Sequence, residues 1–370
     1  MITGYSTSEG TAEFAKNHPN VAKNHFKQFD GLTLSSIGVG TYLGNPDDVT
    51  DTIVKDAVIK SITLGVNVVD TAINYRSQKA ERSVGKAIAQ IIEKNKAKRD
   101  QLFISTKNGY IANDGDVKED FWQNIQNTLV KSNIIKSGDI SSGYHCMTIP
   151  YLKDQLNRSL KNLGLECVDL MYLHNAAEGQ LQDMTKDEFM KRLGDVFEFY
   201  ENQRKSGTIR YYGMATLDCF RVPQEHQQYL SIFDIVKMAR DIGGSENGFK
   251  FIQLPYNMYL DQALTMKNQI HDGTAFSIFE AATKLGIGVF TSVPLMQTKL
   301  LGPNVLPEFG ELTRPSHRAI QFVRSTPGVI APLVGQKSPS HVDENLELAK
   351  IPVLSEKEFS EIVNRLSSQL

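Results

Sequence analysis

Four residues that could move a proton or hold an oxygen follow short apolar runs of this sequence. They are Asp70 at the end of VNVVD, Tyr75 in TAINYRSQ, Lys107 after LFIST and His174 at the end of DLMYLH. A lysine cation beside a tyrosine hydroxyl favours the phenolate and lowers the tyrosine pKa from about 10. A carboxylate would keep the lysine charged, and a histidine can donate a hydrogen bond to an oxygen. Together they would place a proton donor next to an oxygen-binding position, which suits reduction of a carbonyl group.

Each of these residues also has a structural interpretation. An Asp at a strand end is often a turn or helix-capping residue, a loop Tyr usually packs, and a single His is as often structural as catalytic. The functional interpretation therefore depends on convergence of the four residues on one rim of the fold. His145 and Cys146 are adjacent but have no third metal ligand near them in the sequence. We interpret them as loop residues and expect no metal site.

A repeated pattern of helix, glycine and apolar run predicts the elements that position these residues. Helical patterns end at Gly65, Gly164, Gly207, Gly286 and Gly328, and a short apolar run follows each of them. Glycine adopts the left-handed conformation past a helix C-terminus without steric cost, and an unbroken apolar run suits a strand buried on both faces. With further runs near residues 39, 104 and 253, the chain has eight strand candidates.

Eight strands that alternate with helices predict the α/β class and a (β/α)8 TIM barrel. A doubly wound open sheet is the alternative, but no GxGxxG follows the first strand candidate. In a barrel the active site forms where strands end and βα loops begin, so the four residues would share one rim.

Additions to the barrel are also expected. Residues 1–25 are polar and predict a partly ordered N-terminal arm, whereas residues 26–370 predict a single barrel domain. The DG dipeptide in FKQFDGLTLSSIG predicts a β-hairpin before the first barrel strand. Residues 110–150 form an insertion in the third βα unit, and long loops at this face usually shape a substrate site or a subunit contact. Candidates for an apolar pocket are Tyr42, Tyr110, Trp122 and Met296.

The composition predicts a cytoplasmic protein that binds neither nucleic acid nor membranes. The 370 residues are 41% hydrophobic and 22% charged, as in ordinary globular proteins. A net charge of −2 gives no strong attraction to nucleic acid or anionic lipid. No apolar run is long enough to span a membrane, and the first residues lack the pattern of a secretory signal. The three cysteines form no CxxC pair, which suits a reducing compartment.

The segments around these residues resemble the aldo-keto reductase superfamily. The matching segments, in family order from about residue 28 to 350, are GVGTY, VNVVDTAINYRSQKAERSVGKAI, ISTKNGY, LNRSLKNLGLECVDLMYLHN, GTIRYYGMAT, IQLPYN and PLVGQKSPSHVDENL. The resemblance implies a barrel that binds a nicotinamide cofactor, usually NADPH, and reduces aldehydes or ketones to alcohols. It places the family's catalytic Asp, Tyr, Lys and His on Asp70, Tyr75, Lys107 and His174, with Tyr75 as the proton donor.

The resemblance also implies a set of cofactor-binding residues. Gln253 and Thr216 would bind the nicotinamide carboxamide, Tyr256 would stack on the nicotinamide ring, and Ser292 and Leu295 would belong to the loop around the pyrophosphate. The 2′-phosphate and adenine end would meet Lys337, Ser338, His341, Glu344 and Asn345. His341 stands where family members usually have Arg or Gln, and Ala215–Thr216 replaces a common Ser-Asn pair. These matches favour NADPH over NADH.

A second hypothesis comes from the same resemblance. The superfamily includes cofactor-binding regulatory subunits, such as those attached to potassium channels, in which the barrel senses redox state and turns over slowly. Such a subunit would hold NADPH tightly, turn over poorly and co-purify with a partner. Under the reductase hypothesis the partner is a small-molecule carbonyl substrate, whose identity depends on the loops at the barrel mouth.

Overall fold

The computed structural model, which describes residues 1–302 and 305–367, contains a closed barrel of eight parallel strands. The barrel strands are β3 (Gly38–Gly40), β4 (Val68–Asp70), β5 (Phe103–Asn108), β6 (Val168–His174), β7 (Ile209–Ala215), β8 (Phe249–Pro255), β11 (Gly288–Ser292) and β12 (Val329–Gly335). They follow one another around the barrel in chain order, and β12 pairs with β3 to close it. The predicted TIM barrel is confirmed.

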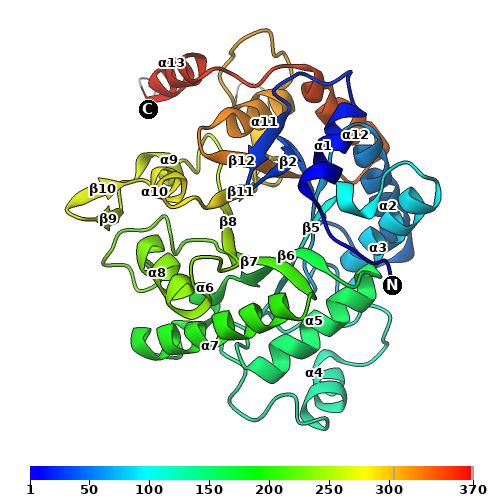
Figure 1. Cartoon of the computed structure of the whole chain (residues 1–370), viewed down its shortest axis with the longest axis vertical. Coiled ribbons are helices and arrows are strands. Elements are labelled where there is room, and N and C mark those ends of the chain that lie inside the picture. Colours follow the sequence, from blue (N-terminus) through cyan, green and yellow to red (C-terminus); the bar gives the residue numbers. More distant parts are fainter. Residues whose placement is uncertain (303–304, 368–370) are drawn as a thin grey trace.

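Helices alternate with the strands and surround them (Figure 1). They are α2 (Asp48–Thr63), α3 (Lys79–Glu93), α5 (Ile149–Leu163), α7 (Lys186–Lys205), α8 (Ile232–Gly243), α10 (Ile278–Leu285), α11 (Pro315–Ser325) and α12 (Pro339–Leu346). The short helix α6 (Ala176–Gln180) precedes α7. Gly164 and Gly286 end α5 and α10 in the left-handed conformation, with φ values of 67° and 69°. The glycine pattern therefore marks true helix ends.

A β-hairpin closes the N-terminal mouth of the barrel, as the DG dipeptide predicts. Strands β1 (Phe26–Phe29) and β2 (Leu32–Ser35) pair antiparallel, and the two turn residues, Asp30 and Gly31, have φ values of 48° and 78°. Two positive φ values are typical of a tight hairpin turn. The hairpin buries Leu32 and Leu34 in one cluster with barrel-interior residues such as Phe103 and Phe251, so ligands cannot enter from this end.

The N-terminal segment differs from the expected partly ordered arm. It forms helix α1 (Ser8–Lys16), which buries Phe14 in the core. Backbone contacts also fix it: Ile2 pairs with Leu165, and the amide of Ser6 donates to the carboxylate of Asp169 at 2.6 Å. The expectation failed because these contacts join residues far apart in the chain, and a polar composition does not reveal them.

The expected insertion lies between β5 and α5 and projects beyond α5 in Figure 1. It contains α4 (Phe121–Ile125) and the π-helical turn η2 (Gln126–Val130), and its two ends meet where Tyr110 pairs with His145.

The remaining elements are peripheral to the barrel. They are η1 (Arg99–Gln101), α9 (Gln262–Thr265), a hairpin of β9 (Gln269–His271) and β10 (Thr274–Phe276), η3 (Met296–Leu301), η4 (Glu347–Lys350) and α13 (Glu356–Ser367). Among the described residues, no helix is both long and apolar enough to cross a membrane.

Candidate active site

A cavity of about 470 Å³ opens where the barrel strands end. The expected site residues that line it are Asp70, Tyr75, His174, Thr216, Gln253, Ser292 and Leu295. They reach it from several separate strands or the loops that follow them, because parallel strands of a barrel end at the same face. Tyr42 and Tyr110 also line the cavity, whereas Trp122 and Met296 do not.

Asp70 and Lys107 form a buried ion pair beneath the cavity. Lys107 Nζ lies 2.5 Å from Asp70 Oδ2 and donates a second hydrogen bond to the carbonyl oxygen of Thr71 at 2.8 Å. The other carboxylate oxygen of Asp70 accepts from Ser105 Oγ at 2.7 Å. Burial lowers the pKa of Lys107, whereas the charge and hydrogen bond of Asp70 act in the opposite direction. The carboxylate therefore favours the charged form of a fully buried lysine.

Tyr75 lies above this pair, with its ring centroid 4.9 Å from Lys107 Nζ. Burial raises the pKa of Tyr75 above its ordinary value, and the Asp70 carboxylate adds to that effect. The expected lowering of this pKa is thus wrong for the resting site, because removal from water outweighs a lysine charge that Asp70 already balances. Tyr75 is a neutral phenol here, which is the form that can donate a proton.

His174 faces Tyr75 across the cavity. The two rings lie edge to face with centroids 5.9 Å apart, and the ring of Tyr110 also packs edge to face with His174, at 5.1 Å. Burial lowers the pKa of His174 well below its ordinary value, and the nearby Lys107 and His145 lower it further. A neutral imidazole between two phenols can donate one hydrogen bond to an oxygen bound in the cavity.

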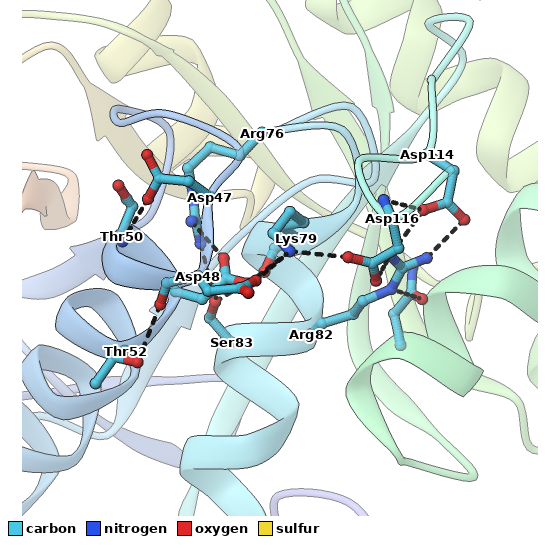
Figure 2. Close-up of polar contacts among 12 residues, drawn as sticks. Asp47, Asp48, Thr50, Thr52, Arg76, Lys79, Arg82, Ser83, Asp114 and Asp116 are labelled. Carbon is cyan, nitrogen blue, oxygen red and sulfur yellow. Dashed lines mark hydrogen bonds and ion pairs between the residues drawn. The ribbon is translucent and has the colours of Figure 1, made fainter. Parts of the chain in front are cut away.

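The turn that carries Tyr75 is held by a network of charged side chains (Figure 2). Arg76, Ser77 and Gln78 follow Tyr75 with φ values of 48°, 54° and 71°, which are unfavourable for residues with a Cβ. Arg76 Nη1 donates to Asp51 Oδ1 of α2 at 2.7 Å, which ties the turn to the neighbouring helix.

Lys79, at the start of α3, extends this network into the insertion. Its amino group lies 3.0 Å from Asp48, 3.1 Å from Asp51 and 2.8 Å from Asp116 (Figure 2). Arg82, one helical turn further on, pairs with Asp116 and with Asp114 of the same insertion loop. The turn after Tyr75 is therefore held between α2, α3 and the insertion.

Two residues, one in β8 and one directly after β7, have groups that fit a nicotinamide carboxamide. Gln253 Nε2 is buried and has no hydrogen-bond partner within the part of the chain that the structure describes. Thr216 lines the same cavity, and its hydroxyl lies 3.5 Å from the backbone carbonyl oxygen of Gln253. A buried, unpaired amide donor costs free energy unless something accepts from it. An amide ligand with its own donor and acceptor atoms would satisfy it.

Tyr256 is not in the cavity, in contrast to its expected stacking on the nicotinamide ring. Strand β8 ends at Pro255, and the next side chain points into the helix layer, where Tyr256 is fully buried between Phe279 and Phe322. Its hydroxyl accepts a hydrogen bond from Thr326 Oγ1 at 3.2 Å. A ring with no exposed face cannot stack on a ligand, so this expectation is wrong.

The residues expected at the adenine end lie in and just before α12 (Pro339–Leu346), beyond the cavity rim at Gly335. Lys337 and His341 are exposed and open to a ligand, and Ser338 caps the helix by accepting from the amide of His341. Asn345 is buried. The carboxylate of Glu344 already accepts a hydrogen bond from Ser316 Oγ at 2.5 Å, so it is less available than expected.

His145 is the residue that sequence reasoning missed. The sequence pattern predicts a loop residue, but His145 is fully buried directly behind His174, whose backbone carbonyl it contacts at 2.9 Å. The contact joins residues 29 positions apart, with α5 and most of β6 between them in the chain. No local pattern could have revealed it, because the intervening segment determines which residues meet.

The part of the chain that the structure describes contains no cluster of metal ligands, and its three thiols are buried. No group of three or more His, Cys, Asp or Glu side chains there could hold a metal ion. The cysteines, Cys146, Cys167 and Cys219, are all buried and unpaired, and burial raises the pKa of each thiol. The protonated, inaccessible thiol is the unreactive form.

Two relatives illustrate the sequence comparisons. The chain is 21% identical over 333 residues to the uncharacterized oxidoreductase YqkF of Bacillus subtilis, covering 89% of this chain and 91% of the relative. It is 23% identical over 216 residues to the NADH-specific methylglyoxal reductase of Escherichia coli, covering 57% of this chain and 56% of that protein.

Solved structures share the fold at similarly low identity. The holo form of aldo-keto reductase AKR11C1 from Bacillus halodurans is 20% identical, with a TM-score of 0.60 over 92% of this chain and 95% of that one. An aldo/keto reductase from Klebsiella pneumoniae, in complex with NADP and acetate, is 18% identical, with a TM-score of 0.60 over 93% and 96%. A model of the aldo/keto reductase family matches residues 36–366. That match spans most of the chain, which therefore belongs to the aldo/keto reductase family.

Proposed function

We propose that this protein reduces aldehyde or ketone carbonyls to alcohols with NADPH, with Tyr75 as the proton donor. The observation that carries the proposal is the arrangement of Tyr75 and His174 on the cavity, above the buried Lys107–Asp70 pair. The family is one of oxidoreductases, and a solved relative of the same fold holds NADP. The proposed setting is the cytoplasm, where the buried free thiols would stay reduced.

Each residue has a role set by its position. A substrate carbonyl oxygen between Tyr75 and His174 would accept one hydrogen bond from each side chain. The bound nicotinamide would supply the hydride to the carbonyl carbon. As negative charge develops on the oxygen, Tyr75 Oη gives up its proton to it, and the Lys107 cation stabilises the phenolate that remains. Asp70 holds Lys107 in place, and water then reprotonates Tyr75.

Two residues at the expected 2′-phosphate position favour NADPH over NADH. Lys337 is exposed beside Ser338 at the N-terminus of α12, where a phosphate would meet both a cation and the positive end of the helix dipole. A relative from Escherichia coli is NADH-specific, so the preference is tested by comparing both cofactors in one assay.

The decisive experiment follows NADPH consumption with a panel of aldehydes, ketones and sugars, in the wild type and in Tyr75→Phe. Loss of the hydroxyl removes the proton donor, so kcat should fall about 10²- to 10⁴-fold while NADPH still binds. Tyr212→Phe is the matched control, since it removes the hydroxyl of another buried tyrosine, one that does not line the cavity. Its kcat should equal that of the wild type.

Two outcomes would contradict the proposal. An unchanged rate in Tyr75→Phe would remove Tyr75 from the mechanism. Tight NADPH binding with no turnover across the panel would favour the redox-sensing subunit, and a search for a co-purifying partner would follow.

A further inference from the structure

A histidine of the insertion occupies a space that two glycines leave open. The ring of His145 packs against Gly109 at the end of β5 and Gly179 in α6, and a Cβ at either position would collide with it. Its backbone pairs with that of Tyr110 to join the two ends of the insertion. The imidazole thus lies where the insertion, β5, β6 and α6 meet, immediately behind the wall of the cavity.

Both ring nitrogens of His145 have partners that require one tautomer. The carbonyl oxygen of His174 can only accept, so Nε2 carries the hydrogen and donates across 2.9 Å. Nδ1 then accepts from Gln180 Nε2 at 3.0 Å. Burial lowers the pKa of His145 to about 4, so the ring is neutral near pH 7 and can keep this arrangement.

The segment held by this hydrogen bond shapes the cavity. Directly after His174, Asn175 adopts a left-handed conformation with φ of 49° and ψ of 45°, which is unusual for a residue with a side chain. This kink allows Asn175 Nδ2 to reach the hydroxyl of Tyr110 at 3.3 Å, while the Tyr110 ring packs edge-on against both His145 and His174. Local propensity does not favour this geometry, so the surrounding contacts must maintain it.

We propose that His145 is a positioning residue for the carbonyl site: its hydrogen bond to the His174 carbonyl fixes the kinked His174–Asn175 backbone and thereby aims the His174 ring at the substrate oxygen. The inference rests on the proposed reductase function. The insertion would then contribute to the active site indirectly. It would orient His174 and would not contact the substrate. Small errors in the placement of such a donor reduce turnover far more than they reduce cofactor binding.

The test compares two substitutions of similar size. In His145→Gln the side-chain amide can still donate from close to the position of Nε2, whereas His145→Leu fills the space without a donor. We expect kcat of His145→Leu to fall about ten- to a hundredfold. NADPH affinity should not change, and His145→Gln should recover most of the rate.

The matched control is His25→Leu. His25 is also fully buried and also bonded at both nitrogens, to the Gly65 carbonyl at 3.1 Å and Ser36 Oγ at 3.3 Å, but it lies beside the hairpin that closes the other end of the barrel. Its loss should reduce stability without changing kcat of the folded protein. Equal kcat losses in His25→Leu and His145→Leu, or no loss in His145→Leu, would overturn the proposal.

A spectroscopic measurement makes the inference independent of turnover. NMR of isotope-labelled histidine should show His145 as the Nε2–H tautomer, and the His174 resonances should shift or broaden in His145→Leu but not in His145→Gln. Should His145→Leu fail to fold, Gln180→Met removes only the donor to Nδ1 and should produce a mixture of tautomers with a smaller loss of kcat. Unperturbed His174 signals in these variants would contradict positioning, even if no substrate in the panel is reduced.

Discussion

Two buried ion pairs lie at opposite ends of the barrel, and only one of them faces the cavity. Lys107–Asp70 joins strand ends at the open mouth, whereas Arg99–Asp169 lies where β5 and β6 begin. Asp169 also accepts from the backbone amide of Ile104 at 2.8 Å, so its partners are as complete as those of Asp70. Under the proposed function, the Lys107–Asp70 pair would contribute to catalysis and to stability, whereas the Arg99–Asp169 pair would contribute to stability alone.

Asp70→Asn should reduce both. Removing one partner of a buried pair leaves the other charge uncompensated and costs about 3–5 kcal/mol of unfolding free energy. Burial then lowers the pKa of Lys107 without opposition from Asp70, so the cationic form is lost at lower pH than in the wild type. Activity should consequently recover as pH falls in kcat profiles of the variant.

Asp169→Asn is the control for this substitution. It should lower the unfolding free energy by a similar amount in urea titrations, while kcat of the folded enzyme and its pH profile stay those of the wild type. If both variants lose kcat equally, the Lys107–Asp70 pair has no special part in the reaction.

At the scale of elements, Tyr75 is positioned by the helices α2 and α3 beside its turn rather than by the strand that precedes it. The three left-handed residues after Tyr75 each cost about 1–2 kcal/mol, and the ion pairs of Arg76 and Lys79 with Asp51 offset this cost. The turn therefore keeps its shape only while α2 and α3 remain in register beside it.

Asp51→Asn should weaken this connection. The side chain of Asp51 is only 12% exposed and faces two cations, so we expect a loss of about 2–4 kcal/mol of unfolding free energy in urea. Asp241→Asn is the comparison, because the Lys237–Asp241 pair on α8 is 73% and 61% exposed and should contribute less than about 0.5 kcal/mol. Equal losses of unfolding free energy would show that the ion pairs of Asp51 stabilise the protein no more than an exposed surface pair does.

At the scale of the whole molecule, buried histidines predict sensitivity to acid. Burial lowers the pKa of His25 to about 3 and that of His145 to about 4, whereas in the unfolded chain both titrate near 6.5. Below pH 6.5 both histidines bind a proton in the unfolded chain but remain neutral in the folded protein. Each histidine therefore removes about 1.4 kcal/mol of unfolding free energy per pH unit as pH falls toward its folded pKa.

Urea unfolding between pH 7 and pH 5 measures this slope. The wild type should become steadily less stable over that interval, and His25→Gln, which cannot titrate, should show a shallower dependence. Parallel curves for the two proteins would mean that His25 is protonated in the folded state.

Local patterns predicted the barrel well because they repeat. A left-handed glycine such as Gly164 and the apolar run after it are both short-range signals, and eight strands in this arrangement allow few other topologies. The same regularity predicts Asp70, Lys107 and His174 at strand ends, so three members of the candidate site can be expected on one rim from the sequence alone.

What sequence reasoning missed depends on contacts between distant residues. Three examples are the burial of α1, the position of His145 behind His174 and the outward orientation of Tyr256. Each follows from packing that the neighbouring sequence does not predict. The predicted lowering of the Tyr75 pKa was wrong for a related reason. Proximity to a lysine could be inferred, but the depth of burial and the balancing charge of Asp70 belong to the folded molecule.

The burial of all three cysteines has a consequence for the chemistry that this protein is proposed to perform. Simple aldehydes add reversibly to accessible thiolates, and α,β-unsaturated carbonyl compounds alkylate them. Here each sulfur is shielded from solvent and held as the unreactive thiol. Under the proposed function, we expect the protein to keep its activity at carbonyl concentrations that modify proteins with exposed thiolates.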